Sequence, residues 1–304
     1  MKVSVILPTY KRLAYLAASL PSVIGQSYPD WECIVINDDP ESRREIDDYA
    51  RSLGDARVRV IHNPQNLHIA RSRNRGIQAA TGDIIAFLDD DDIWLPDHLA
   101  EIVARFKAHP EAGLVYSGYI CRWEGEEQRE EICTALRPPS DTFMAMLRGD
   151  FTFPLASIVN VRKTCLDTTG DFDPQANSLE DWDLFTRIAR RFPIDYAEAA
   201  TVIWRIHPGE RLSTNSKIRL QALKRLESRW GSYPEFSRFA NRLVVNLYYS
   251  DFKRAILTSR NKKLIGVLVE CIRKCGIKNA YNAKIIGKML LLTIFGRFPL
   301  GHFN

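Results

Sequence analysis

The chain has 304 residues, of which 45% are hydrophobic and 26% are charged. This composition excludes an intrinsically disordered, collagen-like or disulfide-scaffold protein, and the net charge of +5 is too small to indicate nucleic-acid binding. The positive charge is concentrated at the end of the chain: residues 251–304 carry eleven Lys or Arg and two acids, whereas residues 1–250 sum to −4.

Short apolar runs alternate with helical segments along the first 215 residues. Runs such as Val3–Leu7 are almost wholly apolar, which is typical of strands buried on both faces. They predict strands at 3–7, 33–36, 58–61, 84–88, near 113–121, near 155–161 and at 194–204. The segments between them predict helices at 13–24, after residue 40, at 70–80, from Pro96 onward and at 179–191. Pro21 predicts a kink or split in the first helix, and Gly82 a C-cap after the helix at 70–80.

This alternation predicts an α/β protein with a mostly parallel sheet flanked by helices. Beyond about residue 215 the pattern is helical throughout, with breaks near residues 231–234 and at Gly276. We therefore predict a domain at 1–214, with halves at 1–95 and 96–214, and a basic helical extension at 215–304. Because ligands bind beyond the carboxyl ends of parallel strands, we expect one cleft to collect Thr9, Asp38 and residues 89–92.

Four consecutive aspartates, residues 89–92, follow a predicted strand. Carboxylates packed this closely repel one another unless a cation neutralises them. Oxygen ligands suit Mg²⁺ or Mn²⁺, so the run indicates a divalent-metal site. The alternative is a solvated acidic loop in which Asp92 caps the next helix.

Other polar groups near predicted strand ends or helix starts have two interpretations each. Asp38 suits a nucleotide site or an ordinary Asx turn. The next group contains three arginines, Arg71, Arg73 and Arg75. They could bind a phosphate group or form a solvated basic face of a helix. Either Glu180 or Asp181 suits a general base, although both also favour a helix N-terminus. His207, in a loop after a strand, suits a metal ligand or a structural histidine.

Taken together, these segments resemble the family 2 glycosyltransferases, inverting enzymes of the Rossmann-like GT-A fold. Five pieces match in order across residues 3–213: Val3-Ser4-Val5-Ile6-Leu7-Pro8-Thr9-Tyr10, Ile34-Val35-Ile36-Asn37-Asp38, Asn66-Leu67 with Arg73-Asn74-Arg75-Gly76-Ile77, Gly82-Asp83 through Asp89-Asp90-Asp91-Asp92, and Leu179-Glu180-Asp181-Trp182-Asp183-Leu184 with Arg205-Ile206-His207. Each piece alone is weak evidence for the family, whereas the five pieces in this order are specific to it.

The resemblance implies a nucleotide-sugar donor, most often a UDP-sugar, and a glycan or lipid-linked hydroxyl as acceptor. It implies that the donor is bound by Pro8, Thr9, Tyr10, Asp38, Arg73, Asp89 and Asp90. Asp89 and Asp91 match the Asp-x-Asp motif, and with His207 they form the implied Mn²⁺ or Mg²⁺ site. Asp181 matches the catalytic base, with Glu180 as its neighbour.

The sequence departs from the family pattern at two places. Asp39-Pro40 replaces a glycine-serine pair, and His68 replaces a common glycine while Arg71 adds a cation. Two alternatives share the fold: a nucleotidyltransferase that makes nucleotide sugars, and a non-catalytic binding protein. The first usually has a glycine-rich loop after the first strand, which Pro8-Thr9-Tyr10-Lys11-Arg12 lacks.

The expected location follows from the cysteines, the start of the chain and the basic tail. The six cysteines are scattered, as in reduced cytoplasmic proteins, and the chain opens on a strand pattern instead of a secretory signal. Residues 251–304 combine basic and apolar segments, which suit either an anionic membrane surface or a helical cap on the catalytic domain. We expect a cytoplasmic protein that reaches the inner face of the cell membrane if the first interpretation holds.

Overall fold

The computed structural model describes residues 1–125, 129–207, 215–257, 261–275 and 280–295. The chain forms two compact units, one of residues 1–145 with 151–209 and one of residues 146–150 with 210–304. The predicted boundary after residue 214 stays a prediction, because residues 208–214 lie outside the described residues.

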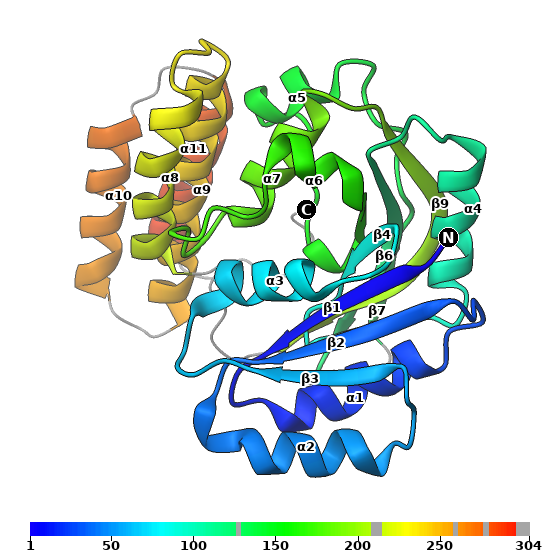
Figure 1. The fold of residues 1–304 in the computed structure, drawn as a ribbon. Helices are drawn as coiled ribbons and strands as arrows, with labels where there is room; N and C mark the ends of the chain where they lie inside the picture. The colour runs from blue at the N-terminus through cyan, green and yellow to red at the C-terminus, as the bar shows by residue number, and fades with distance from the viewer. Residues whose placement is uncertain (126–128, 208–214, 258–260, 276–279, 296–304) are drawn as a thin grey trace. The chain divides into compact units, whose positions relative to one another are not determined.

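The first half of the larger unit is built on parallel strands. Its order is β1 (Val3–Thr9), α1 (Leu13–Ile24), β2 (Trp31–Asn37), α2 (Arg43–Ser52), β3 (Val58–His62), α3 (His68–Ala79) and β4 (Ile84–Phe87). The strands lie in the order β3-β2-β1-β4, all parallel. Helices α1 and α2 cover one face and α3 the other (Figure 1). Both faces are therefore covered, and every residue of β1 and β2 is buried.

The second half of this unit continues the sheet with strands of both directions. It contains β5 (Asp92–Trp94), α4 (His98–Ala108), β6 (Leu114–Trp123), β7 (Glu130–Cys133), the first part of α5 (Thr142–Arg148), β8 (Val159–Arg162), α6 (Lys163–Thr169), α7 (Glu180–Ala189) and β9 (Ile194–Ile206). Strand β8 is antiparallel to both β4 and β6, whereas β9 is parallel to β6. The α/β prediction holds throughout the unit, and the first half alone is wholly parallel. An apolar run indicates a strand but not its direction.

The predicted split at Pro21 is wrong, because α1 runs through this residue as one helix. Proline has no N–H, so it cannot donate to the carbonyl four residues earlier, which belongs to Ala17. The hydroxyl of Tyr49 donates to that carbonyl oxygen at 3.3 Å. A contact from α2 thus replaces the missing bond inside α1.

Two further helix boundaries differ from the prediction. Helix α3 ends at Ala79 with Ala80 as its C-cap, so Gly82 is not the cap. A Cβ on Gly82 would lie 2.7 Å from the carbonyl oxygen of Lys2, so glycine is needed there for a close backbone approach. Helix α4 begins at His98, after Pro96, with Asp97 as its N-cap residue.

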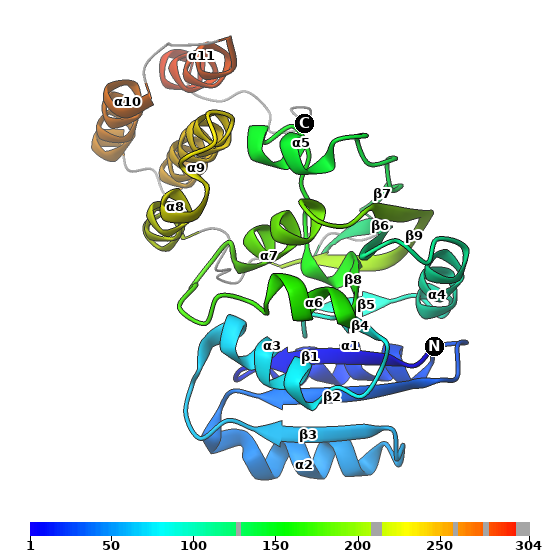
Figure 2. The same cartoon turned by 45° about the horizontal axis from the view of Figure 1, so that its top comes forward.

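The smaller unit is helical, as predicted. It contains α8 (Ser216–Trp230), α9 (Phe236–Leu257), α10 (Asn261–Cys275) and α11 (Ala280–Phe295). Helix α9 contacts the other three (Figure 2), and the predicted break near 231–234 separates α8 from α9. The predicted break at Gly276 lies outside the described residues. Buried side chains of α9, α10 and α11 share a core that includes Val245, Phe252, Cys271, Ile286 and Met289. Among the described helices, none has the length and apolarity needed to cross a membrane.

Candidate active site

The ends of β1, β2 and β4 bring the predicted strand-end residues together. Thr9 pairs in register with Asn37, and its carbonyl oxygen accepts the backbone N–H of Asp38 at 2.9 Å. Its hydroxyl donates to Oδ2 of Asp90 at 2.8 Å. Thr9 therefore links the residue after β2 with the aspartate run after β4, as the sequence predicts for parallel strands.

Asp38 is buried and ties the end of β2 to the start of α3. Its Oδ1 accepts the side-chain amide of Asn63 at 2.6 Å and the backbone N–H of Leu67 at 2.7 Å. From the sequence, the alternative role of Asp38 is an Asx turn. In the structure Asp39 makes this turn, because its Oδ1 accepts the backbone N–H of Glu41 at 3.3 Å. Pro40 stiffens this turn. No pattern in the sequence predicts the contact from Asn63.

The four aspartates have four different surroundings. Asp89 pairs with Arg73, Asp90 with Thr9 and Arg12, and Asp91 with Arg12 and His207. Asp92 is the first residue of β5 and accepts the hydroxyl of Ser157 at 2.5 Å. The alternative in which Asp92 caps a helix is therefore wrong.

Burial reduces the negative charge of this run. It raises the pKa of Asp90 to about 7, although the guanidinium of Arg12 opposes the shift. Burial also raises the pKa of Asp92 well above its ordinary value, and its charged neighbours add to the effect. The run therefore carries fewer than four negative charges at neutral pH, and Arg12 and Arg73 balance part of what remains.

Arg73 connects the aspartate run with α7. Its side chain is only 3% exposed, with Nη2 donating to Oδ1 of Asp89 at 2.6 Å and Nη1 to Oε1 of Glu180 at 2.9 Å. Burial opposes its charge, yet Asp89 and Glu180 raise its pKa above the ordinary value. The expected contact between Arg73 and the donor stays a prediction, because its guanidinium is directed to these two carboxylates.

The other two arginines of this helix bind backbone carbonyls. Nε of Arg71 donates to the carbonyl oxygen of Pro174 at 2.8 Å, and Nη1 of Arg75 donates to that of His62 at 3.0 Å. Neither is directed to a carboxylate of the aspartate run.

Glu180 and Asp181 diverge at the start of α7. Glu180 is buried, and burial together with the charge of Asp181 raises its pKa to about 7 while Arg73 opposes the shift. Asp181 is partly exposed, and its Oδ1 accepts the backbone N–H of Trp182 at 2.7 Å. Adjacent helical residues point about 100° apart, so Glu180 is committed to Arg73 while Asp181 remains accessible from solvent.

Left-handed backbone conformations border the site. Among the described residues, the non-glycine residues with positive φ are Lys11 (55°), His68 (65°) and Leu179 (59°). Each precedes or begins a segment that carries site residues, and each costs about 1–2 kcal/mol relative to an ordinary conformation. The replacement of a family glycine by His68 was the one sequence signal of this strain.

The end of β9 holds the aspartate loop in place. Nε2 of His207 lies 3.1 Å from Oδ2 of Asp91, and the His207 ring packs 5.1 Å from that of Tyr15. Arg205 donates from Nε to the backbone oxygen of Asp91 at 2.7 Å. Sequence reasoning missed the roles of Arg12, Tyr15 and Arg205, because their partners lie far away along the chain.

The donor set around Asp91 fits a divalent cation held partly by substrate. A carboxylate and an imidazole meet there, and the described residues contain no group of three His, Cys, Asp or Glu side chains that could enclose a metal ion. The third predicted ligand, Asp89, is engaged by Arg73. Magnesium-type ions are commonly bound by one or two carboxylates plus phosphate oxygens. The pair therefore suits an ion that arrives with a diphosphate, but not an all-protein cage.

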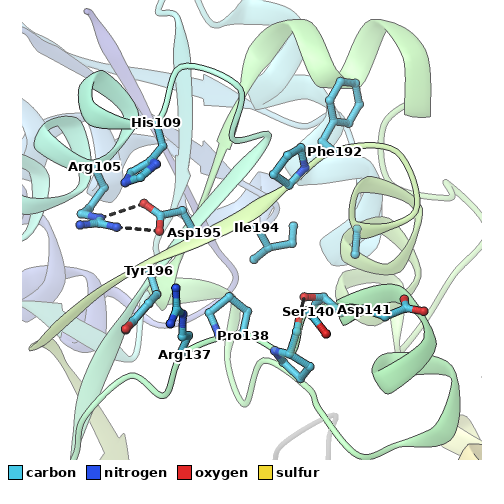
Figure 3. Close-up of a pocket in the computed structure, with 14 residues that line it drawn as sticks. Arg105, His109, Arg137, Pro138, Ser140, Asp141, Phe192, Ile194, Asp195 and Tyr196 are labelled. Carbon is cyan, nitrogen blue, oxygen red and sulfur yellow. Dashed lines mark hydrogen bonds and ion pairs between the residues drawn. The ribbon is translucent and has the colours of Figure 1, made fainter.

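A pocket of about 540 Å³ lies at the other end of β9. It is lined by the start of this strand, the end of α4 and residues 137–142 (Figure 3). Arg105 and Asp195 form a two-bond ion pair there, at 2.7 and 2.8 Å. None of the predicted site residues lines this pocket. The strand-end cluster is therefore the better candidate for chemistry.

The fold and the strand-end acids are typical of an α/β transferase of the glycosyltransferase class. The model of the family described as "Glycosyl transferase family 2" matches residues 4–164, more than half of the chain. The chain belongs to this family, and it is a glycosyltransferase.

Known proteins similar to the chain support this assignment. It is 28% identical over 216 residues to "Putative colanic acid biosynthesis glycosyl transferase WcaA" of Escherichia coli K12, covering 70% of this chain and 76% of that protein. Among solved structures, S. aureus TarS 1–349 in complex with UDP-GlcNAc has a TM-score of 0.57 at 16% identity, with 98% and 93% coverage. The chain spans about half (52%) of a longer TarS chain.

A second solved structure is similar to the chain to the same degree. The mannosyltransferase PcManGT from Pyrobaculum calidifontis, in complex with GDP-Man and Mn²⁺, has a TM-score of 0.57 at 15% identity, with 98% and 88% coverage. At these identities the structural likeness shows the fold alone, and it confirms the predicted GT-A class.

Proposed function

We propose that this glycosyltransferase is an inverting enzyme that moves a sugar from a UDP-sugar to a hydroxyl of a glycan or lipid-linked acceptor. The observation that carries the proposal is the bridge from Asp89 through Arg73 to Glu180. It brings the start of α7, and with it Asp181, to the loop that follows β4. A group able to accept a proton thus lies beside the loop that would bind the donor.

The proposed reaction is a single displacement at the anomeric carbon. The acceptor oxygen bonds to this carbon while Asp181 accepts its proton, and the bond to the nucleoside diphosphate breaks on the opposite face. One displacement inverts the anomeric centre and forms no covalent glycosyl-enzyme. Glu180 acts on Asp181 through position and charge, because its own carboxylate is bound by Arg73.

The donor is assigned to the strand-end residues. Pro8, Thr9, Tyr10 and Asp38 hold the nucleoside in this proposal, and Arg73, Asp89 and Asp90 support the ribose and diphosphate side. Asp91 and His207 would hold Mn²⁺ or Mg²⁺, with Asp89 as the further predicted ligand. When bound, the ion neutralises charge that develops on the diphosphate. The Mn²⁺ and GDP-Man in PcManGT, and the UDP-GlcNAc in TarS, support these choices.

A panel of nucleotide sugars tests the donor assignment. We expect a UDP-sugar with Mn²⁺ to raise the melting temperature, because a ligand that binds only the folded state stabilises it. The product formed with a matching acceptor should have the anomeric configuration opposite to the donor's, measured by NMR. Release of pyrophosphate from a nucleoside triphosphate and a sugar phosphate would favour the nucleotidyltransferase alternative.

The helical unit is assigned to an anionic membrane surface, where a lipid-linked acceptor would reside. Helix α10 exposes Val269 (56%) and Ile272 (37%), and the exposed cations Arg273 and Lys274 follow them directly, with Glu270 at 3.9 and 3.6 Å from the two cations. Apolar side chains beside cations suit the interface of an anionic bilayer. The protein would then act at the inner face of the cell membrane.

Vesicle co-sedimentation of the full chain tests this assignment. The double variant Val269→Asp, Ile272→Asp should lose binding to vesicles rich in phosphatidylglycerol. The control Leu136→Asp, at a residue 75% exposed in the other unit, should bind like the wild type. Equal sedimentation of all three proteins would count against membrane binding by α10.

A further inference from the structure

Arg12 is the most exposed of the arginines bound to the aspartate run. Its Nη1 lies 3.0 Å from Oδ2 of Asp91 and 3.4 Å from Oδ1 of Asp90, and its side chain is 40% exposed. Arg73, which binds Asp89, is 3% exposed, and Arg205, which binds backbone oxygens of the run, is 12% exposed. The guanidinium is thus the exposed partner of a partly buried group, in which Asp91 is 20% and Asp90 7% exposed. Its contact can be exchanged when another cation takes its place at these carboxylates.

Arg12 and a divalent cation would compete for one carboxylate. Asp91 is the acid that meets His207, and it is also the acid that Arg12 contacts most closely. Two positive groups at one carboxylate repel each other at short range. Metal binding at Asp91 therefore favours a different position for the guanidinium.

A diphosphate gives the displaced guanidinium a better partner. Guanidinium groups bind phosphate oxygens through paired, charge-assisted hydrogen bonds. Arg12 lies directly before α1, at the end of β1 where the donor is assigned, and its long exposed side chain can turn without disturbing the core.

We propose that Arg12 is an exchangeable counter-cation: it neutralises Asp90 and Asp91 in the free protein, and passes to the donor diphosphate when a divalent cation binds Asp91. This inference rests on the proposed function for the metal site at Asp91 and for the donor diphosphate. Because of the exchange, the protein should bind the divalent cation weakly when the donor is absent and more tightly when the donor is present.

The exchange predicts opposite effects of one substitution on two ligands. In calorimetric or EPR titrations with Mn²⁺ alone, Arg12→Gln should bind the ion about tenfold more tightly than the wild type, because a competing charge is removed. With UDP in the presence of saturating Mn²⁺, the same variant should bind about tenfold more weakly, because a charge-assisted contact is lost.

Two further variants control for net charge and for folding. Lys11→Gln makes the same charge change one residue away, at a side chain whose ammonium lies over the ring of Tyr10 (5.4 Å), and it should leave Mn²⁺ binding unchanged. Arg12→Lys keeps the charge and should bind Mn²⁺ like the wild type. With UDP and saturating Mn²⁺ it should bind more weakly than the wild type, because an ammonium cannot form the paired bonds of a guanidinium, and this result tests the exchange if Arg12→Gln fails to fold.

The outcomes separate this inference from the proposed function. Equal Mn²⁺ affinities of Arg12→Gln and Lys11→Gln would overturn the exchange, as would unchanged UDP binding by Arg12→Gln. Failure of the wild type to bind any nucleoside diphosphate with Mn²⁺ would instead overturn the proposed function. The Mn²⁺ titration without nucleotide stays informative in that case.

Discussion

Two groups of charges lie in the site, and their arginines differ in burial. The bridge consists of Asp89, Arg73 and Glu180, with a guanidinium that is 3% exposed. The open cluster consists of Arg12, Asp91 and the buried His207, with a guanidinium that is 40% exposed. Both pair arginine with carboxylates at similar distances.

The difference in burial assigns different tasks to the two groups. A buried ion pair is costly to break, because either partner left alone is an unpaired buried charge. The bridge therefore fixes geometry between α3, the aspartate run and α7. In the open cluster, Arg12 and Asp91 can exchange partners with ions and ligands, as donor binding requires.

The largest expected effect lies just beside the bridge. Asp181→Asn should lower the rate of transfer about 10³-fold, because a general base is lost, while donor affinity stays unchanged. Transfer would be measured with saturating donor, and affinity by calorimetry. The exposed Asp167→Asn on α6 serves as the control. Lost donor affinity with transfer intact would contradict the assignment of Asp181.

The bridge itself should be essential to stability. Arg73→Ala should reduce the free energy of unfolding by about 3 kcal/mol, because the buried Glu180 and the partly buried Asp89 lose their cation. Arg51→Ala removes an exposed pair with Asp48 (2.9 Å, Arg51 73% exposed) and should cost at most about 1 kcal/mol. Urea unfolding measures both. Equal losses would erase the distinction between buried and open charges.

The open cluster should affect ligand binding more than stability. Asp91→Ala should weaken Mn²⁺-dependent donor binding by about tenfold or more, with little change in the unfolding midpoint. His207→Ala should weaken it likewise, and it should also lower the midpoint because the buried ring packs against Tyr15. Chelation with EDTA should make the two variants and the wild type bind donor alike. His109→Ala, at a histidine of the distant pocket, is the control. A variant that keeps the full Mn²⁺ effect would remove that residue from the metal site.

The smallest expected effect is a pH dependence from the bridge. Glu180 has an ordinary pKa of 4.5 and a folded pKa of about 7, raised first by burial. The folded state therefore retains the proton between these values, so the contribution of Glu180 to stability falls as pH rises from about 4.5 to 7.

Glu180→Gln removes this titration and keeps an acceptor for Arg73. Relative to the wild type, the variant should be more stable at pH 8 than at pH 5, by on the order of 1 kcal/mol. Some pH dependence should persist, because burial also raises the pKa of Asp90. An identical pH profile for both proteins would mean that Glu180 is charged throughout this range.

The sequence by itself predicted most of what depends on neighbouring residues. Apolar runs and helical periodicities placed most of the regular elements of the larger unit, since burial on one or two faces imposes a local pattern. The short elements β5, β7, α5 and α6 were missed, because a few residues give no clear period. The convergence of Thr9 and Asp38 with the aspartate run followed from parallel strands alone.

Only the tertiary structure decided which partner each charged group takes. Arg73 and Glu180 are 107 residues apart, and His207 and Asp91 are 116 residues apart. The continuity of α1 through Pro21 likewise depends on Tyr49 in another helix. Local sequence fixes where a side chain stands along its own strand or helix, but its charge state and contacts depend on burial by segments far along the chain.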